Sequence, residues 1–240
     1  NKARVATRNM AMSRQKKLDK MDVIELAKEK PKPEFHFKTA RTPSRFVVET
    51  EDLVIGYDEP LSKPLNLRVE RGDKIVLTGS NGIGKTTLLK SILGLIPALS
   101  GKVQLGDYLE IGYFEQEMPK GNKNTCIQEI WDVFPSYTQY EVRAALAKCG
   151  LTTKHIESLV RVLSGGEQAK VRLCKIMNRE SNVLILDEPT NHLDVEAKDE
   201  LKRALKEYKG TILMVCHEPE FYEGLATDVW DCSSWTTRIQ

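Results

Sequence analysis

The sequence lacks any long apolar run, since the longest ones, around residues 92–99 and 183–186, end at Gly, Pro or Asp. A helix needs about 18 successive apolar residues to cross a membrane, so no membrane-spanning segment is expected. The five cysteines form an odd set without a CxxC pair, and the four histidines are just as scattered. This pattern argues against a disulfide framework and a zinc site, and it predicts reduced thiols in a cytoplasmic protein.

Charge is unevenly distributed along the 240 residues, although the net charge is only +2. Residues 1–30 hold nine Lys and Arg against four Asp and Glu, so the rest of the chain sums to −3. The same segment contains no Gly or Pro, which predicts a long, exposed basic helix. Pro31, Pro33 and Pro43 then predict an extended connector, so residues 1–45 form a first region distinct from a domain over 46–240.

The domain over 46–240 alternates between strand and helix patterns. Short strands are expected at 45–48, 53–56, 65–70 and 108–114, and compact apolar runs at 74–78, 183–186 and 211–215 suit buried parallel strands. The clearest helix is 195–208, and residues 126–160 are expected to be wholly helical. These patterns predict an α/β fold with a parallel-sheet core, a lobe made by the early strands, and a helical subdomain at about 117–163.

A glycine-rich loop lies between an expected strand and an expected helix. It reads Gly79, Ser80, Asn81, Gly82, Ile83, Gly84, Lys85, Thr86, which matches GxxxxGK[ST], and Thr87 follows it. The backbone N–H groups of such a loop can surround a triphosphate, and the dipole of the following helix adds to the attraction. Lys85 would contact the β- and γ-phosphates, and Thr86 would offer its hydroxyl to Mg²⁺. The alternative is a chance glycine-rich turn.

Two carboxylates, Asp187 and Glu188, end the buried run at 183–186. A carboxylate at the C-terminal end of a parallel strand faces the ligand crevice of an open α/β sheet. Asp187 would hold Mg²⁺ through water, and Glu188 would position and polarise an attacking water. Many surface strands end in Asp–Glu, so the pair predicts nucleotide hydrolysis only in combination with the glycine-rich loop.

Residues 163–167 read Leu, Ser, Gly, Gly, Glu. Ser164 and Glu167 are also explained as a capping box for a helix that runs through Met177. That explanation does not cover Gly165 and Gly166, because glycine in the first turn of a helix costs up to about 1 kcal/mol relative to alanine. Exposed N–H groups at this helix start predict a second phosphate-binding element.

Together, these three motifs resemble the ATP-binding cassette superfamily over residues 46–240. The resemblance implies a P-loop ATPase with a parallel-sheet core, an antiparallel β lobe and a helical subdomain, and it implies ATP and Mg²⁺ as ligands. It also implies a second cassette as partner, because Ser164, Gly165, Gly166 and Glu167 would contact the γ-phosphate of a nucleotide held by the opposite cassette.

Three further residues take roles only through this resemblance. Tyr57 resembles the aromatic residue that stacks on adenine, although a half-buried strand tyrosine is the alternative. Gln116 resembles the glutamine that joins Mg²⁺ and the attacking water. His217 resembles the histidine that touches the γ-phosphate, and a structural histidine is its alternative. The implied catalytic residues are then Glu188, His217 and Gln116, and the implied metal ligands are Thr86, Gln116 and Asp187.

Two features resemble the ABC-F branch, whose members act on ribosomes: the sequence Glu-Pro-Thr-Asn-His-Leu-Asp at 188–194 and the basic region 1–45. The resemblance implies a second cassette of a twin-cassette chain, preceded by the end of an interdomain linker that reaches toward tRNA in the ribosome and suits RNA phosphates. It predicts a translation or antibiotic-protection factor. Three alternatives stay open: the ATPase subunit of a membrane transporter, a slow nucleotide-gated clamp, and a merely solvated basic helix.

Overall fold

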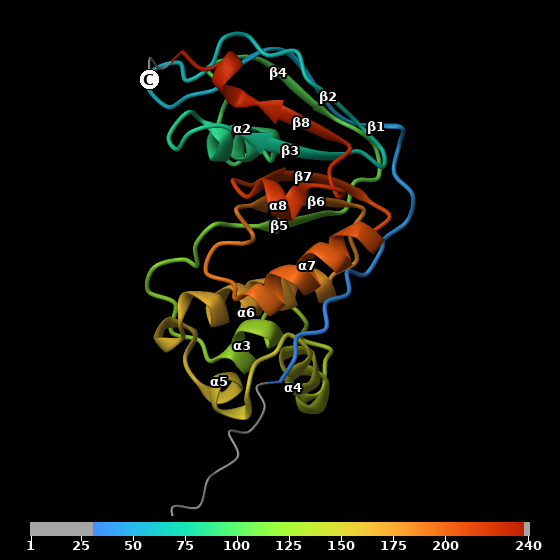
Figure 1. The fold of residues 1–240 in the computed structure, drawn as a ribbon, viewed down its shortest axis with the longest axis vertical. Helices are drawn as coiled ribbons and strands as arrows, with labels where there is room; N and C mark the ends of the chain where they lie inside the picture. The colour runs from blue at the N-terminus through green and yellow to red at the C-terminus, as the bar shows by residue number, and fades with distance from the viewer. Residues whose placement is uncertain (1–30, 238–240) are drawn as a thin grey trace, which may run out of the picture. The chain divides into compact units, whose positions relative to one another are not determined.

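Two β-sheets organise residues 31–237, the part of the chain that the computed structural model describes (Figure 1). The larger sheet is parallel in all its pairings and has the order β5 (Ile111–Phe114), β6 (Val183–Asp187), β7 (Thr211–Val215), β3 (Lys74–Thr78), β8 (Asp228–Asp231). The smaller sheet is antiparallel and has the order β2 (Arg68–Glu70), β1 (Phe46–Val54), β4 (Ser100–Leu105). The parallel core and the antiparallel lobe agree with the expected fold class.

Helices connect and cover the parallel strands. They are α2 (Lys85–Ile92), α3 (Cys126–Trp131), α4 (Gln139–Lys148), α5 (Thr153–Glu157), α6 (Gly165–Asn178), α7 (Val195–Glu207) and α8 (Pro219–Tyr222), with short 3₁₀ turns at Val160–Val162 and Cys232–Ser234. In Figure 1, α2 lies between the two sheets, and α3, α4 and α5 gather in a helical lobe beyond α6 and α7. Residues 1–30, where a long helix is expected, lie outside the described residues.

Alternate side chains of the parallel strands enter two separate apolar cores. Val76, Leu184 and Met214 pack in the cluster that includes residues of α6 and α7. Ile75 and Ile185 pack in the cluster that includes residues of α2 and of the antiparallel sheet. Successive strand residues point to opposite faces, so a sheet covered on both faces requires apolar residues at every position. This requirement explains the uninterrupted apolar runs at 75–77, 183–186 and 212–215.

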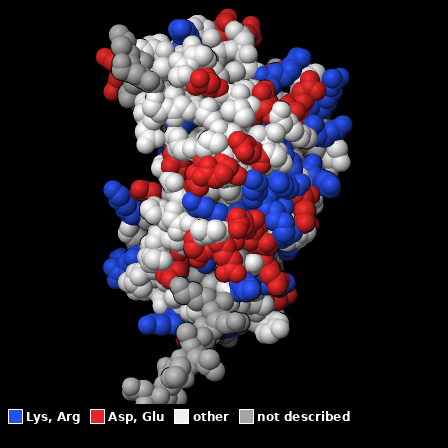
Figure 2. Space-filling view, in the orientation of Figure 1, with Lys and Arg blue, Asp and Glu red and all other residues white. Residues whose placement is uncertain are grey.

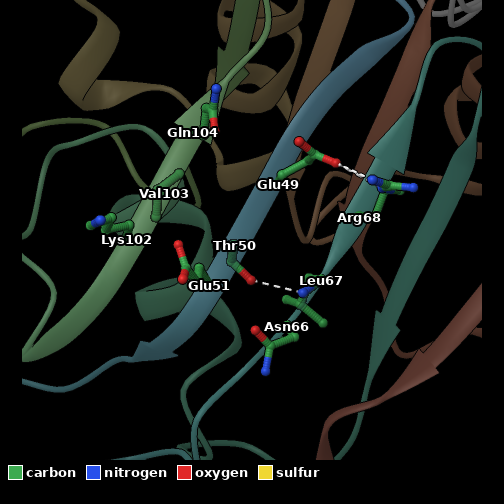
Figure 3. Close-up of a pocket in the computed structure, with 9 residues that line it drawn as sticks. All are labelled: Glu49, Thr50, Glu51, Asn66, Leu67, Arg68, Lys102, Val103 and Gln104. Atoms are coloured by element: carbon green, nitrogen blue, oxygen red, sulfur yellow. Dashed lines mark hydrogen bonds and ion pairs between the residues drawn. The ribbon is translucent and has the colours of Figure 1, made fainter.

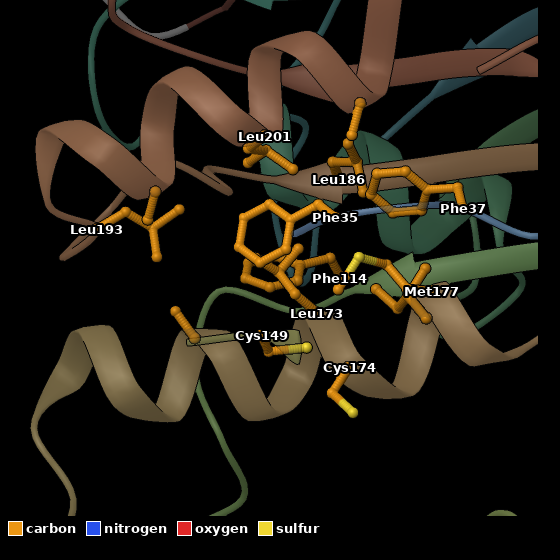
Figure 4. Packing of buried hydrophobic residues seen from close by; sticks show 14 of the residues in the cluster. Phe35, Phe37, Phe114, Cys149, Leu173, Cys174, Met177, Leu186, Leu193 and Leu201 are labelled. Carbon is orange, nitrogen blue, oxygen red and sulfur yellow. The ribbon is translucent and has the colours of Figure 1, made fainter. Parts of the chain in front are cut away.

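The segment 31–45 is extended, as expected, but it packs into the domain. Phe35 and Phe37 are 1% and 4% exposed and lie in the α6–α7 core (Figure 4). The N–H of Phe35 donates to Glu200 Oε1 at 2.8 Å, and Arg203 Nη2 donates to the carbonyl of Phe35 at 2.8 Å. Residues from Pro31 onward therefore belong to the compact unit, which begins before the expected boundary at 45/46.

The antiparallel lobe differs from the expected strands. The two strands expected at 45–48 and 53–56 form one strand, β1, whose pairing shifts register between Glu51 and Val54. Asp52 takes a φ of 45° within this irregularity, which breaks the alternation of apolar residues. Of the strand expected at 65–70, only β2 forms, and at 108–114 the strand starts at Ile111. The strands β4 and β8 were not predicted, because most of their side chains are exposed and give no apolar period.

Residues 126–160, which were expected to be wholly helical, form three short helices, α3, α4 and α5, with non-helical residues between them. Pro135 lies between α3 and α4, and Gly150, with a φ of 85°, lies between α4 and α5. Thr138 and Thr152 then cap α4 and α5, each with a capping box. These breaking and capping residues were the signals that the helix prediction overlooked. The helix expected at 195–208 is confirmed within one residue by α7.

Across residues 31–237, none of the helices combines the length and the apolar character needed to cross a membrane.

We predict that Phe35→Ala lowers the free energy of unfolding by about 3–5 kcal/mol, because it empties a fully buried aromatic position. Urea unfolding followed by circular dichroism measures this loss. Tyr140→Ala is the control, since Tyr140 is 80% exposed and its removal should cost less than about 0.5 kcal/mol. If the two substitutions cost the same, residues 31–45 would not be part of the fold.

Candidate functional site

Four adjacent strands of the parallel sheet end at the same edge, and the chain that leaves each of them carries expected site residues. The loop 79–86 follows β3, Gln116 follows β5, Asp187 and Glu188 end β6, and His217 follows β7. A cleft of about 450 Å³ lies there, within the usual size of small-molecule sites. It is lined by Tyr57, Leu61, Asn81, Gly82, Gly84, Lys85, Thr86, Thr87, Gln116 and Glu188.

The glycine-rich loop is shaped by three glycines in the left-handed region, Gly79, Gly82 and Gly84, with φ of 125°, 80° and 109°. Residues with a Cβ rarely adopt these angles. Ile83 anchors the loop, because its side chain is 4% exposed and packs in the α2-side core. Gly84 is the N-cap of α2 and offers no side-chain cap, so the first N–H groups of this helix remain available to an anion.

Lys85 lies under the loop rather than in solvent, at 6% exposure. Its ammonium donates to the carbonyls of Gly79 at 2.7 Å and Ser80 at 2.6 Å. Burial lowers the pKa of Lys85, and the carboxylates of Glu188 and Asp187 act in the opposite direction. An ammonium has three N–H bonds, so this geometry leaves one donor for a phosphate oxygen.

Asp187 and Thr86 have the donor set and the unmet need that fit Mg²⁺. Thr86 Oγ1 donates to Asp187 Oδ1 at 3.1 Å, whereas the buried Oδ2 of Asp187 has no hydrogen-bond partner. Burial raises the pKa of Asp187, because an unpaired charge is costly away from water. No group of three or more His, Cys, Asp or Glu within residues 31–237 could hold a metal alone. Mg²⁺ is usually held by one or two protein groups together with phosphates, and Thr86 and Asp187 would be such a pair.

Glu188 is held in a left-handed conformation, with a φ of 50°. Its N–H donates to the carbonyl of Val215 at 3.1 Å, which fixes the end of β6 against β7. Its carboxylate contacts Gln116 Nε2 at 3.1 Å and His217 Nε2 at 3.3 Å. The structure thus brings together the three residues expected to be catalytic.

The helix start at Ser164 forms the expected capping box but does not line this cleft. Ser164 Oγ accepts from the N–H of Glu167 at 3.3 Å, and Glu167 Oε2 accepts from the N–H of Ser164 at 2.9 Å. Glu167 Oε1 also lies 3.2 Å from His155 Nε2. Ser164 is therefore not part of the cleft at the edge of the parallel sheet of its own chain.

Gly165 and Gly166 have a steric explanation that sequence reasoning missed. A Cβ on Gly165 would lie 2.8 Å from Cγ of His192, and a Cβ on Gly166 would lie 2.5 Å from the carbonyl oxygen of His192. The turn after Glu188 therefore packs directly on the first turn of α6. The glycine pair is compatible with an anion site but does not by itself require one.

Sequence reasoning also missed Asn191 and Arg172. Asn191 Nδ2 donates to Glu188 Oε2.

Arg172 is 9% exposed, stacks 4.6 Å from the ring centre of Phe114, and donates through Nη1 to the carbonyl of Glu115. It thereby ties α6 to the residue before Gln116. The available signal was its place among Ala169, Leu173 and Ile176, since an arginine on the apolar face of a helix needs a buried partner.

A larger hollow, about 590 Å³, is lined by residues of the antiparallel sheet and of the segment just before β2 (Figure 3). Its charged side chains are already paired in part, since Glu49 and Arg68 form an ion pair at 2.6 Å. Its lining contains no glycine-rich loop and no helix start. The smaller cleft at the sheet edge is therefore the better candidate for phosphate chemistry.

Comparison with known proteins shows the family to which the chain belongs. A family model described as ABC transporter matches residues 62–191. An uncharacterized ABC transporter ATP-binding protein of Bacillus subtilis, YfmM, is 72% identical over 239 residues, which cover 100% of this chain and 46% of that protein. ABC transporter F family member 2 of Arabidopsis thaliana is 36% identical over 93% of this chain and 34% of its own length. The chain thus spans half or less of these relatives.

A solved ATP-binding cassette, dimeric in a post-hydrolysis state with ADP and Pi, has a TM-score of 0.67 to this structure. The two are 18% identical, and the match covers 77% of this chain and 93% of that one. At this identity the likeness concerns the fold alone, and it confirms the expected cassette architecture.

We predict that Gly165→Ala lowers the free energy of unfolding by about 1–3 kcal/mol, because the new methyl group meets the ring of His192. In a His192→Ala background the ring atoms are gone, so the same substitution should cost less. Gly166→Ala is the matched control, since it meets the backbone oxygen of residue 192 and should cost the same in both backgrounds. Equal costs for Gly165→Ala in both backgrounds, measured by urea unfolding, would contradict the packing.

Proposed function

The chain belongs to the ABC transporter family as an ATP-binding cassette, and we propose that it hydrolyses Mg²⁺–ATP. In this proposal Glu188 is the catalytic base, and a second cassette pairs with this one to complete the site. We further propose that the whole protein is an ABC-F factor acting on ribosomes in the cytoplasm, in translation or antibiotic protection. The observation that carries the hydrolytic part is the convergence of Gln116, Glu188 and His217 beside the glycine-rich loop and Lys85.

ATP would lie along the cleft with its adenine on Tyr57, which is 60% exposed and lines the cleft. The N–H groups of the loop and of the start of α2 would bind the phosphates, and Lys85 would reach the β- and γ-phosphates. Thr86 would ligate Mg²⁺, with Asp187 and Gln116 completing its protein ligands. When bound, Mg²⁺ neutralises charge on the phosphate oxygens.

Hydrolysis needs a water in line with the γ-phosphate and a group that polarises it. Glu188 would accept a hydrogen bond from this water, and Gln116 would orient the same water. His217, whose Nε2 lies 3.3 Å from Glu188 Oε1, would turn this nitrogen toward the γ-phosphate as the nucleotide enters. Each of these residues follows a different strand of one rigid sheet, so their spacing is set by the backbone.

The case for a second cassette is that Ser164, Gly165 and Gly166 form a helix start apart from this cleft. Ser164 and Gly165 are exposed, so a nucleotide on another cassette could reach them. The structurally similar cassette was solved as a dimer with ADP and Pi. In such a pair, each helix start would close the nucleotide site of the partner.

The case for a ribosomal role is the basic segment 1–30, the turn at 188–194 and the similarity to an F family relative. On the face drawn in Figure 2, Lys and Arg of the described residues lie beside Asp and Glu. Arg203, for example, lies 2.7 Å from both Glu200 and Glu207. Attraction to RNA phosphates is therefore assigned to the segment 1–30 and not to this face of the cassette.

We predict that Glu188→Gln lowers ATP turnover of the whole protein at least 100-fold, because glutamine keeps the shape but loses the charge that polarises water. ATP affinity, measured by calorimetry, should stay within a few-fold of the wild type. Glu223→Gln, an exposed glutamate outside the cleft, serves as the control. Wild-type turnover in Glu188→Gln would remove Glu188 as the base.

The ribosomal role is tested by sedimentation of the Glu188→Gln protein with ribosomes in ATP. We predict ATP-dependent binding that weakens with salt by about 0.7–0.9 log units per log unit of salt for each phosphate neutralised. Changing Arg4, Arg8, Arg14, Lys16 and Lys17 to Gln should make this slope shallower and leave ATP affinity unchanged. Absence of ATP-dependent sedimentation would contradict the ribosomal role and favour a transporter subunit.

A further inference from the structure

The carboxylate of Glu188 receives hydrogen bonds from two side chains and lies close to a third. His217 Nε2 contacts Oε1 at 3.3 Å, Gln116 Nε2 contacts Oε2 at 3.1 Å, and Asn191 Nδ2 donates to the same Oε2. The first two already have roles in the proposed hydrolysis, but Asn191 has none. We propose that Asn191 is a positioning residue for hydrolysis, which holds Oε2 of Glu188 so that Oε1 faces the attacking water.

The contact is chemically well defined. A carboxylate has only acceptors, so the amide of Asn191 must present its nitrogen and not its oxygen. An amide carries no charge, so it holds the carboxylate without pairing off the charge that polarises water. The side chain of Glu188 is 16% exposed, which strengthens a hydrogen bond relative to one in water.

Asn191 differs from the other two side chains because it belongs to the same turn as Glu188. Its N–H donates to the carbonyl of Glu188 at 3.1 Å, so backbone and side chain bind the same residue. Gln116 and His217 come from other strands, and their proposed roles require them to turn toward the metal and the γ-phosphate. Asn191 can keep its contact throughout the reaction.

The turn that carries Asn191 is itself fixed on both sides. Thr190 and Leu193 are buried, at 3% and 7% exposure. His192, with a φ of 65°, packs on Gly165 and Gly166. The packing of the turn against α6 therefore fixes the position of Asn191. The hydrogen bond from Asn191 in turn fixes the carboxylate of Glu188.

This proposal rests on the proposed function, since it assumes that Glu188 is the base. It is tested with Asn191→Ala, Asn191→Ser and Asn191→Asp in the whole protein. The alanine and serine variants remove the amide, and the aspartate variant keeps its shape but places an acceptor against an acceptor. Turnover and KM for ATP are measured at saturating Mg²⁺, with thermal unfolding of each variant to confirm the fold.

We expect kcat to fall about 10-fold in Asn191→Ala and further in Asn191→Asp, with KM within about two-fold of the wild type. In a Glu188→Gln background, single-turnover hydrolysis should change less than about two-fold when Asn191 is replaced, because the carboxylate it positions is already gone. Asn122→Asp is the matched control: Asn122 donates to Glu129 Oε2 at 2.9 Å in the helical lobe, so the same chemical change occurs away from the cleft. Its kcat should match the wild type.

The proposal is overturned if Asn191→Ala and Asn191→Asp keep the wild-type kcat, or if they fold but raise KM alone. It is also overturned if replacing Asn191 costs as much in Glu188→Gln as in the wild type, since a purely structural role would act in both backgrounds. If Glu188→Gln lowers turnover and the Asn191 variants do not, only this inference fails. If Glu188→Gln itself keeps wild-type turnover, the assignment of the base fails and this inference falls with it.

Discussion

The parallel pairing of β6 with β5 and β7 is the constraint on which the site depends. All residues of β6 are buried, and its neighbours hold it in a register that sets Leu186 beside Phe114 and Asp187 beside Val215. Since parallel strands end at a common edge, the segments after β5, β6, β7 and β3 converge there. No long-range contact between the site side chains is needed to gather them, because the sheet does so.

The same pairing explains how the helical lobe is joined to the site. The chain from β5 to β6 must cross over, and the lobe occupies that crossover, so Gln116 begins it and α6 returns from it. Arg172 of α6 reaches back to the carbonyl of Glu115, and His192 of the turn after β6 packs on Gly165. Helix α6 is therefore attached to the site by two contacts. Arg172 binds the segment that follows β5, and Gly165 packs against the turn that follows β6.

Sequence reasoning identified the strands that have a clear apolar pattern and the loop that has a specific sequence motif. The apolar runs of β3, β6 and β7 are visible because burial on both faces requires apolar residues at every position, and the loop 79–86 is visible because its chemistry needs glycines at fixed spacing. The exposed strand β4 left no such trace, because backbone hydrogen bonds to β1 define it. Phe35 was hidden by the prolines around it, since prolines indicate a break in regular structure but not whether the segment is buried.

The contacts around Glu188 were beyond sequence reasoning for a different reason. Gln116 and His217 were assigned to the site by resemblance to the cassette family. Asn191 lies within the 188–194 sequence, which indicated the ABC-F branch but gave no role to the side chain of Asn191. It contacts a glutamate whose backbone is left-handed, with a φ of 50°, and no periodicity in the sequence indicates that conformation. For the glycine pair at 165–166, sequence reasoning recognised a possible anion site but missed the packing against His192. The two explanations are compatible.

The account is tested most directly by a crystal structure of the chain with Mg²⁺ and ATP, carrying Glu188→Gln to prevent turnover. It predicts the phosphates over the N–H groups of 79–86, adenine on Tyr57, and Mg²⁺ on Thr86 beside Oδ2 of Asp187, the buried oxygen that has no partner in the protein. A nucleotide bound elsewhere, or phosphates in this cleft with Oδ2 of Asp187 turned away from the metal, would contradict it.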